Sequence, residues 1–248
     1  MDLHIHTCLS PCADNSMRPP LIVRLAAERG VDCIGITDHN ATDNLPAVRR
    51  AAAGSGVAVL GGMELTTVEE IHLLVLLDDP AAIAELQRIV DLNLDGENDE
   101  RAIGEQLVVD EHGECTGRNP RLLIGATALT IERALEVAHG LNGVCIASHV
   151  DRQSFSIMSQ LGFVPKGLAL DALEVLPRSP MSPAAAGAAG APGGAGHWAA
   201  TGFPLVRFSD AHFPEDIGCI ATSALLDGPS VEELKNALAG RNGREILH

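Results

Sequence analysis

The sequence predicts an α/β protein built on a mostly parallel sheet, and three observations support this fold class. Short apolar segments typical of buried strands alternate along the chain with segments typical of helices. Polar residues that can bind metals recur directly after several of these strands, as they do at the carboxyl-terminal edge of a barrel. The Gly-x-Gly-x-x-Gly turn expected after the first strand of an open doubly wound sheet is absent, so we favour a barrel over that alternative.

The first predicted strand lies in residues 2–7 and contains two histidines. Successive side chains of a strand alternate between its faces, so His4 and His6 are predicted to share one face, with Leu3 and Ile5 on the other. Two neighbouring imidazoles make a poor apolar core and a good pair of metal ligands. The spacing alone leaves a structural role open, and the segments that follow must decide.

The remaining elements are predicted in chain order from apolar runs, from proline and glycine at helix ends, and from a capping box formed by Ser230 and Glu233. Helices are expected at about 19–29, 45–53, 80–90, 131–139 and 230–240. Strands are expected at about 31–37, 57–60, 71–77, 144–147, 168–175, 205–208 and 217–226.

Two stretches interrupt this alternation. Residues about 95–125 form a polar insertion, with a possible hairpin at 106–113. Residues about 179–197 are rich in Ala, Gly and Pro and are predicted to form a low-complexity surface loop or a loosely specified helix. The length suits one large domain or two small ones, and we expect residues 1–248 to form a single domain.

The amino-acid composition limits which binding partners and which cellular compartment are expected. With 17 Lys and Arg against 33 Asp and Glu, the formal net charge of −16 argues against an extended nucleic-acid surface, although not against a small phosphate-binding cleft. One Trp, five Phe and no Tyr leave few platforms for stacking bases. Six scattered cysteines without a C-x-x-C pair predict a reducing compartment. Neither a signal peptide nor a run of roughly 18 apolar residues is recognised, so a cytoplasmic protein without a membrane partner is expected.

Nine residues, most of them at predicted strand ends, are candidate metal ligands. Imidazoles and carboxylates without clustered thiolates suit Zn, Mn or Fe at a working site. Nine ligands are too many for one ion and predict two or three divalent metal ions, with Glu64 or Asp210 as a bridge. Clustered cations can activate water and stabilise charge during the hydrolysis of phosphate esters. The candidates are His4, His6, Asp14, His39, Glu64, His72, His149, Asp210 and His212.

In these motifs the chain resembles the polymerase and histidinol phosphatase (PHP) superfamily of metal-dependent phosphoesterases. The resemblance implies a distorted (β/α)7 TIM-like barrel with a metal site at the C-terminal ends of the strands. It also implies hydrolysis of a phosphomonoester or phosphodiester, and we expect a small phosphorylated metabolite or a nucleotide as substrate. The matching segments are Asp2-Leu-His-Ile-His-Thr7, Gly35-Ile-Thr-Asp-His39, Gly62-Met-Glu64, the strand with His72, Ser148-His149 and Ser209-Asp-Ala-His212.

The resemblance also implies how the ligands divide among three ions. The first ion would take His4, His6, Glu64 and Asp210. The second would take Glu64, His72 and His149. The third would take His39, His212 and a residue from the loop after His6, where Ser10-Pro-Cys-Ala-Asp14 replaces the family's usual Ser-Asp-Gly type of sequence. Asp14 is the predicted ligand in that loop, and Cys12 is the alternative.

Three further residues receive roles beside the ligands. Asp38 and Asp2 are predicted to orient ligand imidazoles, with simple solvation at a strand end as the alternative. Arg152 is predicted to clamp a substrate phosphate through its planar guanidinium, with a surface salt bridge as the alternative. Asp38 and Arg152 are thus the predicted catalytic residues.

Two other functions stay open at this point. The first is a metal-stabilised structural or regulatory domain with little activity, against which the nearly complete ligand set argues. The second is hydrolysis of a C–N bond, because amidohydrolase barrels also open with His-x-His. The segments that end in His39 and His212 favour the phosphoesterase.

Overall fold

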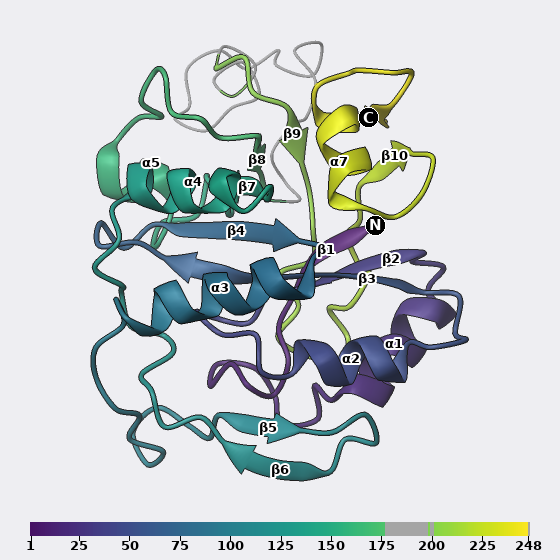
Figure 1. Ribbon diagram of the computed structural model, residues 1–248, viewed down its shortest axis with the longest axis vertical. Coiled ribbons are helices and arrows are strands. Elements are labelled where there is room, and N and C mark those ends of the chain that lie inside the picture. The colour runs from purple at the N-terminus through teal and green to yellow at the C-terminus, as the bar shows by residue number, and fades with distance from the viewer. Residues whose placement is uncertain (177–197, 199–200, 248) are drawn as a thin grey trace.

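The computed structural model describes residues 1–176, 198 and 201–247, and its central feature is a curled sheet of seven strands (Figure 1). The expected low-complexity loop at 179–197 therefore lies outside the described residues. In spatial order the strands are β1 (Asp2–Ile5), β2 (Cys33–Ile36), β3 (Ala58–Thr66), β4 (His72–Leu77), β7 (Val144–Ala147), β8 (Ala172–Glu174) and β9 (Leu205–Val206).

Helices cover both sides of this sheet. In the view of Figure 1, α1, α2 and α3 lie below β3 and β4, and α4, α5 and α7 lie above them. Proline in the first turn begins the first three helices, where its missing N–H costs no helical hydrogen bond. The helices are α1 (Pro19–Glu28), α2 (Leu45–Ala51), α3 (Pro80–Asp91), α4 (Ile131–Gly140), α5 (Ile157–Leu161) and α7 (Val231–Leu238).

Strand β4 runs antiparallel to both of its neighbours, β3 and β7, whereas the other neighbouring strands are parallel. Thr66 at the end of β3 pairs with His72 at the start of β4. The start of β4 therefore lies at the same edge of the sheet as the ends of the other strands. This reversal explains why His72 begins its strand, whereas His4 and Glu64 lie near the ends of theirs.

One face of the sheet carries a small apolar cluster that includes Leu60, Leu74 and Leu76. Side chains two residues apart share a face of a strand, so Glu64 lies on the face of Leu60, and His72 on the face of Leu74. Helix α7 contributes three buried side chains to the same cluster. The polar residues of this face thus lie next to an apolar layer that α7 covers.

Strand β1 contains an irregularity that the alternation rule does not predict. Asp2 pairs with Ile34 and Ile5 with Ile36, so three steps along β1 match two along β2, as in a β-bulge. Leu3 belongs to the small cluster, whereas Ile5 belongs to the larger core under the helices. The prediction that Leu3 and Ile5 share a face is therefore wrong, because the bulge shifts the alternation.

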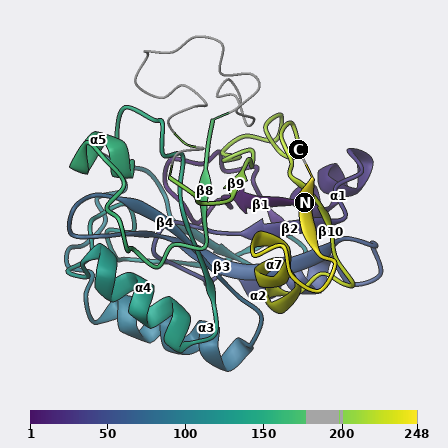
Figure 2. The ribbon, with the colours of Figure 1, turned by 90° about the horizontal axis from the view of Figure 1, so that it is seen from above.

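The chain after β9 returns to the first strand. Ala211 forms a parallel bridge with Ile5, its N–H donates to His4 O at 3.1 Å, and the His6 N–H donates to Ala211 O at 3.0 Å. Seen from above, β9 and β1 project near each other, and the segment that follows β9 makes the contact with β1 (Figure 2). The structure is a mixed α/β fold whose seven-stranded sheet curls into a half-barrel, consistent with a TIM-like fold.

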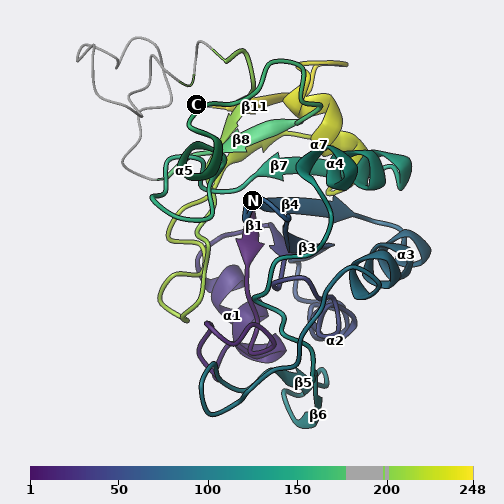
Figure 3. The same cartoon turned by 90° about the vertical axis from the view of Figure 1, so that its left-hand side faces the viewer.

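The polar insertion contains the expected hairpin, formed by β5 (Leu107–Val109) and β6 (Cys115–Arg118). It lies at the bottom of the molecule in both Figure 1 and Figure 3. The side chain of Asn44 bonds to both strand ends of β5, at Leu107 O and the Val109 N–H, and also to Thr7 Oγ1. The hairpin is thereby attached to the loop that follows β1.

Two expectations for the C-terminal part need correction. The expected strand at 217–226 does not join the main sheet, because its first half forms turns around Gly218 at φ +66°, and only β10 (Ser223–Leu225) remains, paired with β11 (Glu245–Leu247). Only half of the expected capping box forms: Ser230 Oγ accepts from the Glu233 N–H, but the Glu233 carboxylate accepts from Asp227 and Arg244 instead.

Among the described residues, no helix combines the length and the apolar character needed to cross a bilayer.

Candidate metal centre

Glu64, near the end of β3, lies at the middle of a cluster of buried histidines. Oxygen Oε1 lies 3.3 Å from His4 Nε2, 3.0 Å from His72 Nδ1 and 3.2 Å from His149 Nε2, and Oε2 lies 3.4 Å from His6 Nε2 and 3.1 Å from His39 Nδ1. Burial alone would raise the pKa of Glu64, but the surrounding imidazoles, led by His72, outweigh it and hold the pKa well below its usual value. The carboxylate is therefore ionised and can bridge two cations.

Asp210 supplies a second carboxylate from the loop after β9. Its Oδ1 lies 3.2 Å from His4 Nε2 and 3.4 Å from His6 Nε2, and those two ring nitrogens are 3.2 Å apart. Its backbone has φ +50°, a left-handed conformation that aspartate tolerates better than most residues. The returning chain thereby turns this carboxylate toward the histidines of β1.

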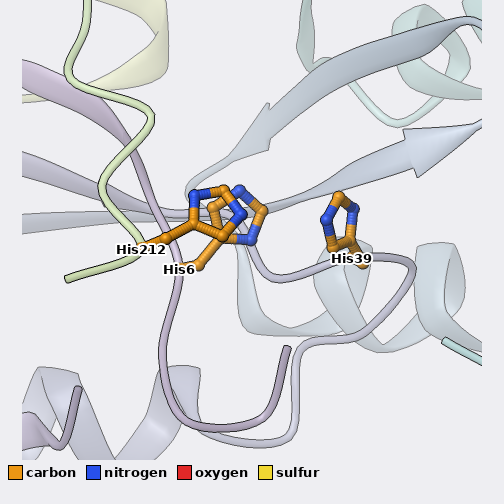
Figure 4. Close-up of side chains that lie close together, drawn as sticks. All are labelled: His6, His39 and His212. Carbon is orange, nitrogen blue, oxygen red and sulfur yellow. The ribbon is translucent and has the colours of Figure 1, made fainter. Parts of the chain in front are cut away.

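Potential ligand atoms form three overlapping groups, in each of which they lie within 4.8 Å of one another. Figure 4 shows the group in which the rings of His6 and His212 lie next to each other, with His39 opposite, each from a different segment. The groups are His4, His6, Glu64 and Asp210; His39, Glu64 and His72; and His6, His39 and His212.

The donor atoms fit divalent metal ions. Nδ1 of His39, Nδ1 of His72 and Oδ1 of Asp210 are buried and have no hydrogen-bond partner, which is unusual for buried polar atoms. Ligands about 2.1 Å from one ion in a tetrahedron are about 3.4 Å apart, close to the distances around Glu64. A shared cation would satisfy these atoms, since none of them is placed to hydrogen-bond with another.

The groups agree in part with the division that the resemblance implies. The four residues expected around the first ion lie together. His39 lies with Glu64 and His72 as well as with His6 and His212, so it stands between the second and third groups. His149 approaches the same Glu64 oxygen as His4 and His72 but belongs to none of the three groups.

The loop after His6 places its two candidate ligands differently. The Asp14 side chain is exposed, its Oδ1 accepts a hydrogen bond from the Ser16 N–H at 2.8 Å, and it belongs to none of the three groups. Its backbone N–H donates to His212 O at 2.9 Å, so the loop itself reaches the segment that carries His212. Cys12 has an exposed surface, yet it lines a cavity of about 420 Å³ together with Asp210 and His212. Burial, followed by the charge of Glu64, raises the pKa of its thiol to about 12.

Asp38 lies behind the site rather than at its mouth. It is fully buried, and its carboxylate accepts from the N–H and hydroxyl of Thr7, at 2.7 and 2.8 Å, and from the Ser10 hydroxyl at 2.7 Å. Ser10 Oγ lies 3.0 Å from His6 Nδ1. Asp38 thus touches an imidazole only through Ser10, a geometry that favours positioning over the predicted catalytic role.

Asp2 also contacts no ring through a hydrogen bond. Its carboxylate accepts from the Ser209 N–H at 3.0 Å, from Ser209 Oγ at 2.6 Å and from the Gly218 N–H at 2.9 Å. It therefore fixes the loop that carries Asp210, and the prediction that it orients an imidazole directly needs correction.

Arg152 lines the cavity beside Cys12 and His212. Its Nη1 lies 3.4 Å from Asp210 Oδ2, and 45% of its side chain is exposed. The guanidinium therefore forms a salt bridge, as in the alternative to the predicted phosphate clamp, and it is also partly exposed beside the cavity.

Sequence reasoning missed Glu174, the last residue of β8. It is buried, and both of its oxygens approach His4 Nδ1, at 3.1 and 3.0 Å. A signal was available, because Glu174 follows apolar residues at the end of a predicted strand, as Glu64 does. Phe155, whose ring stacks on His72 at 4.9 Å between centroids, was missed as well.

The curled sheet and the cluster at its edge define the class: α/β proteins with a candidate centre for several metal ions. Residues 2–155 match the family model of the PHP domain. That match covers more than half of the chain, which therefore belongs to the PHP family, in agreement with the resemblance seen in its motifs.

Two curated relatives match shorter segments. The chain is 40% identical over 73 residues to the 5'-3' exoribonuclease Rnm of Salmonella typhimurium, covering 29% of this chain and 24% of the relative. It is 32% identical over 78 residues to the phosphoribosyl 1,2-cyclic phosphate 1,2-diphosphodiesterase of Eggerthella lenta, covering 29% of each protein. These matches span under a third of either relative's length.

Among solved structures, the chain is similar to endonuclease Q in complex with a 27-mer duplex substrate that carries an abasic lesion. The TM-score is 0.68 at 20% identity, and the match covers 99% of this chain and 57% of endonuclease Q. At that identity, the likeness establishes the fold.

Proposed function

We propose that this protein hydrolyses a phosphomonoester or phosphodiester with two or three divalent metal ions as cofactors. The observation that carries the proposal is the buried Glu64 carboxylate, which lies within 3.4 Å of five imidazoles. Membership of the PHP family supports it, as do the phosphoester-cleaving activities in the names of the relatives.

In this proposal the three groups of ligand atoms hold the ions, with Glu64 as the bridge. Zn, Mn or Fe suits these donors, and such ions polarise phosphate oxygens and activate water when bound. Asp38 and Asp2 keep the loops after β1 and β9 in place, so that the ligands are held before the ions arrive. Arg152 extends from the same rim and is placed to hold an outer phosphate oxygen.

We infer a small phosphorylated metabolite or a nucleotide as the substrate. The net charge of −16 works against long nucleic acids, which need a broad basic surface. The duplex bound by endonuclease Q makes a duplex with an abasic lesion the natural alternative to test.

We also infer that residues 1–248 form one cytoplasmic PHP-type domain. Its fold would be a distorted (β/α)7 barrel with the site at the C-terminal ends of the strands. The pairing of Ala211 with β1 supports the barrel.

Removing the metals is expected to abolish turnover of a generic aryl phosphate or of an aryl phosphodiester. Protein treated with a chelator and then desalted should lose activity, because the proposed nucleophile is water that the bound ions activate. Adding back Zn²⁺, Mn²⁺ or Fe²⁺ separately should restore it, and the rates identify the working ion. Full turnover by the metal-free protein would overturn the proposal. A metal-loaded protein inert toward every ester tested would instead favour the structural or regulatory alternative.

We propose that Cys12, and not Asp14, is the metal ligand from the loop after His6. The number of metal ions bound per chain in two variants tests this. The exposed Asp14 carboxylate already bonds to Ser16, whereas Cys12 lines the cavity with His212. The count per chain is expected to fall by one in Cys12→Ser and to stay unchanged in Asp14→Asn. The opposite pattern would assign the ligand to Asp14.

Arg152→Ala is expected to raise KM about tenfold and to leave the metal content unchanged, because the lost contact is with the substrate. Steady-state kinetics and metal analysis on the same preparation test this. Arg133, exposed on α4 and paired with Glu136, provides the matched Arg133→Ala control. Unchanged kinetics in Arg152→Ala would reduce Arg152 to a surface ion pair with Asp210.

A further inference from the structure

Glu174 is a buried carboxylate with two different partners in the cluster. It ends β8, is 3% exposed, and lies 3.1 and 3.0 Å from the Nδ1 atom of His4 through its two oxygens. Oε2 also accepts the backbone N–H of His149 at 2.9 Å. It appears in none of the three groups of ligand atoms. Its carboxylate therefore contacts residues of the cluster without being a candidate ligand itself.

The contact with His4 determines which ring nitrogen faces the cluster. A carboxylate accepts hydrogen bonds only, so Nδ1 of His4 must carry the proton that it shares with Glu174. In the neutral ring the lone pair then lies on Nε2, which is 3.3 Å from Glu64 Oε1 and 3.2 Å from Asp210 Oδ1. A carboxylate behind a ligand imidazole fixes the tautomer and makes the ring a stronger ligand.

The contact with His149 concerns the backbone. His149 has φ +29°, an uncommon conformation for a residue with a side chain. Its N–H is fixed by Glu174 Oε2, and the next N–H, from Val150, donates to Glu174 O at 2.8 Å. Both ends of Glu174 therefore hold the turn that brings His149 Nε2 to 3.2 Å from Glu64.

We propose that Glu174 is a positioning residue that sets the metal affinity of the centre by holding His4 through its ring and His149 through its backbone. One side chain thus organises two imidazoles that both approach Glu64 Oε1. The inference rests on the proposed metal centre, and it assigns Glu174 no contact with substrate.

Glu174→Gln tests this role with almost no change in volume. An amide has one accepting oxygen and one donating NH2 group, so it cannot accept at both oxygen positions. Oε2 is the oxygen that contacts both the His149 N–H and His4 Nδ1. If the amide oxygen takes its place, the NH2 group takes the place of Oε1, 3.1 Å from His4 Nδ1, where it cannot accept the ring proton and so weakens the preference for the tautomer with Nδ1–H. We expect the Kd for Zn²⁺ and for Mn²⁺, measured by competition with a chromophoric chelator, to rise about 10- to 100-fold.

Asp171→Asn is the matched control. Asp171 Oδ2 likewise accepts from a ring nitrogen and a backbone N–H, His139 Nε2 at 2.9 Å and Cys145 N at 2.7 Å, but neither partner belongs to the cluster. It should lower thermal stability without changing either Kd. In the zinc-loaded protein, ¹⁵N–¹H spectra of the histidine rings should show the His4 Nδ1–H signal in Asp171→Asn and lose or shift it in Glu174→Gln.

Unchanged metal affinity together with an unchanged His4 ring signal in Glu174→Gln would overturn the inference. Should that variant be recovered only unfolded, Glu174→Asp, which keeps the charge but shortens the reach, carries the same expected loss of affinity. Glu64→Gln separates the two proposals. If it abolishes metal binding while Glu174→Gln binds normally, only the role of Glu174 fails; if Glu64→Gln also binds normally, the metal centre itself fails.

Discussion

Glu64→Gln is expected to lower kcat/KM for phosphoester hydrolysis by about 1,000-fold or more, equal to about 4 kcal/mol of transition-state stabilisation. The carboxylate lies within 3.4 Å of five imidazoles, and its ionised form is the one that these rings favour. A neutral amide carries no negative charge with which to bridge two cations. Its NH2 group would also face imidazole nitrogens that are expected to bind metal. Metal should therefore be lost from more than one position.

Metal analysis and steady-state kinetics on the same sample check this expectation. Glu132→Gln, at an exposed position in the first turn of α4, is the control and should match the unaltered protein in both. If Glu64→Gln bound the full complement of metal and turned over normally, Glu64 could not be the bridge. A loss of thermal stability with unchanged hydrolysis would instead indicate a structural role for the metals.

Gly62→Ala is expected to destabilise the fold by about 3 kcal/mol or more, a large part of the roughly 5–15 kcal/mol that stabilises a typical domain. Gly62 pairs with Leu76 between β3 and β4, and a Cβ atom added there would lie 1.9 Å from Val75 O. Backbone atoms of a central strand cannot move aside by that much without breaking the pairing. The same two strands carry Glu64 and His72, so activity should be lost together with stability.

Urea unfolding measures the loss, and Gly117→Ala is the matched control. Gly117 lies on β6, and an added Cβ atom meets nothing within 4 Å there, so a change of no more than about 1 kcal/mol is expected. Equal stabilities for Gly62→Ala and Gly117→Ala would mean that β3 and β4 are not packed as closely as described.

Local pattern was sufficient for most of the elements. Apolar runs and helix-end residues located the helices that became α1 to α4 and α7, and the hairpin in the insertion was expected. The histidine and carboxylate motifs identified the family, which the match over residues 2–155 confirms. These features are encoded by neighbours along the chain, where single-sequence reasoning is strongest.

What the pattern missed depends on contacts between distant segments. The bulge in β1 depends on its pairing with β2, so residues 2–7 alone could not reveal that Leu3 and Ile5 separate. The role of Glu174 depends on a partner 170 positions away, His4, which no local rule connects to it. Contacts of this kind can be identified only in the three-dimensional structure.

The return of the chain from β9 to β1 has a consequence for how the protein is made. Asp2 bonds to Ser209 and Gly218, and His4 lies against Asp210, so partners more than 200 residues apart complete the cluster. Contacts of such long sequence separation form slowly, and during synthesis the first strand must wait until the ribosome has released the last one. Until then, the histidines of β1 have no carboxylate from the far end of the chain to share a cation with. Acquisition of the full metal complement would therefore mark the end of folding, and a metal-sensitive probe could time it.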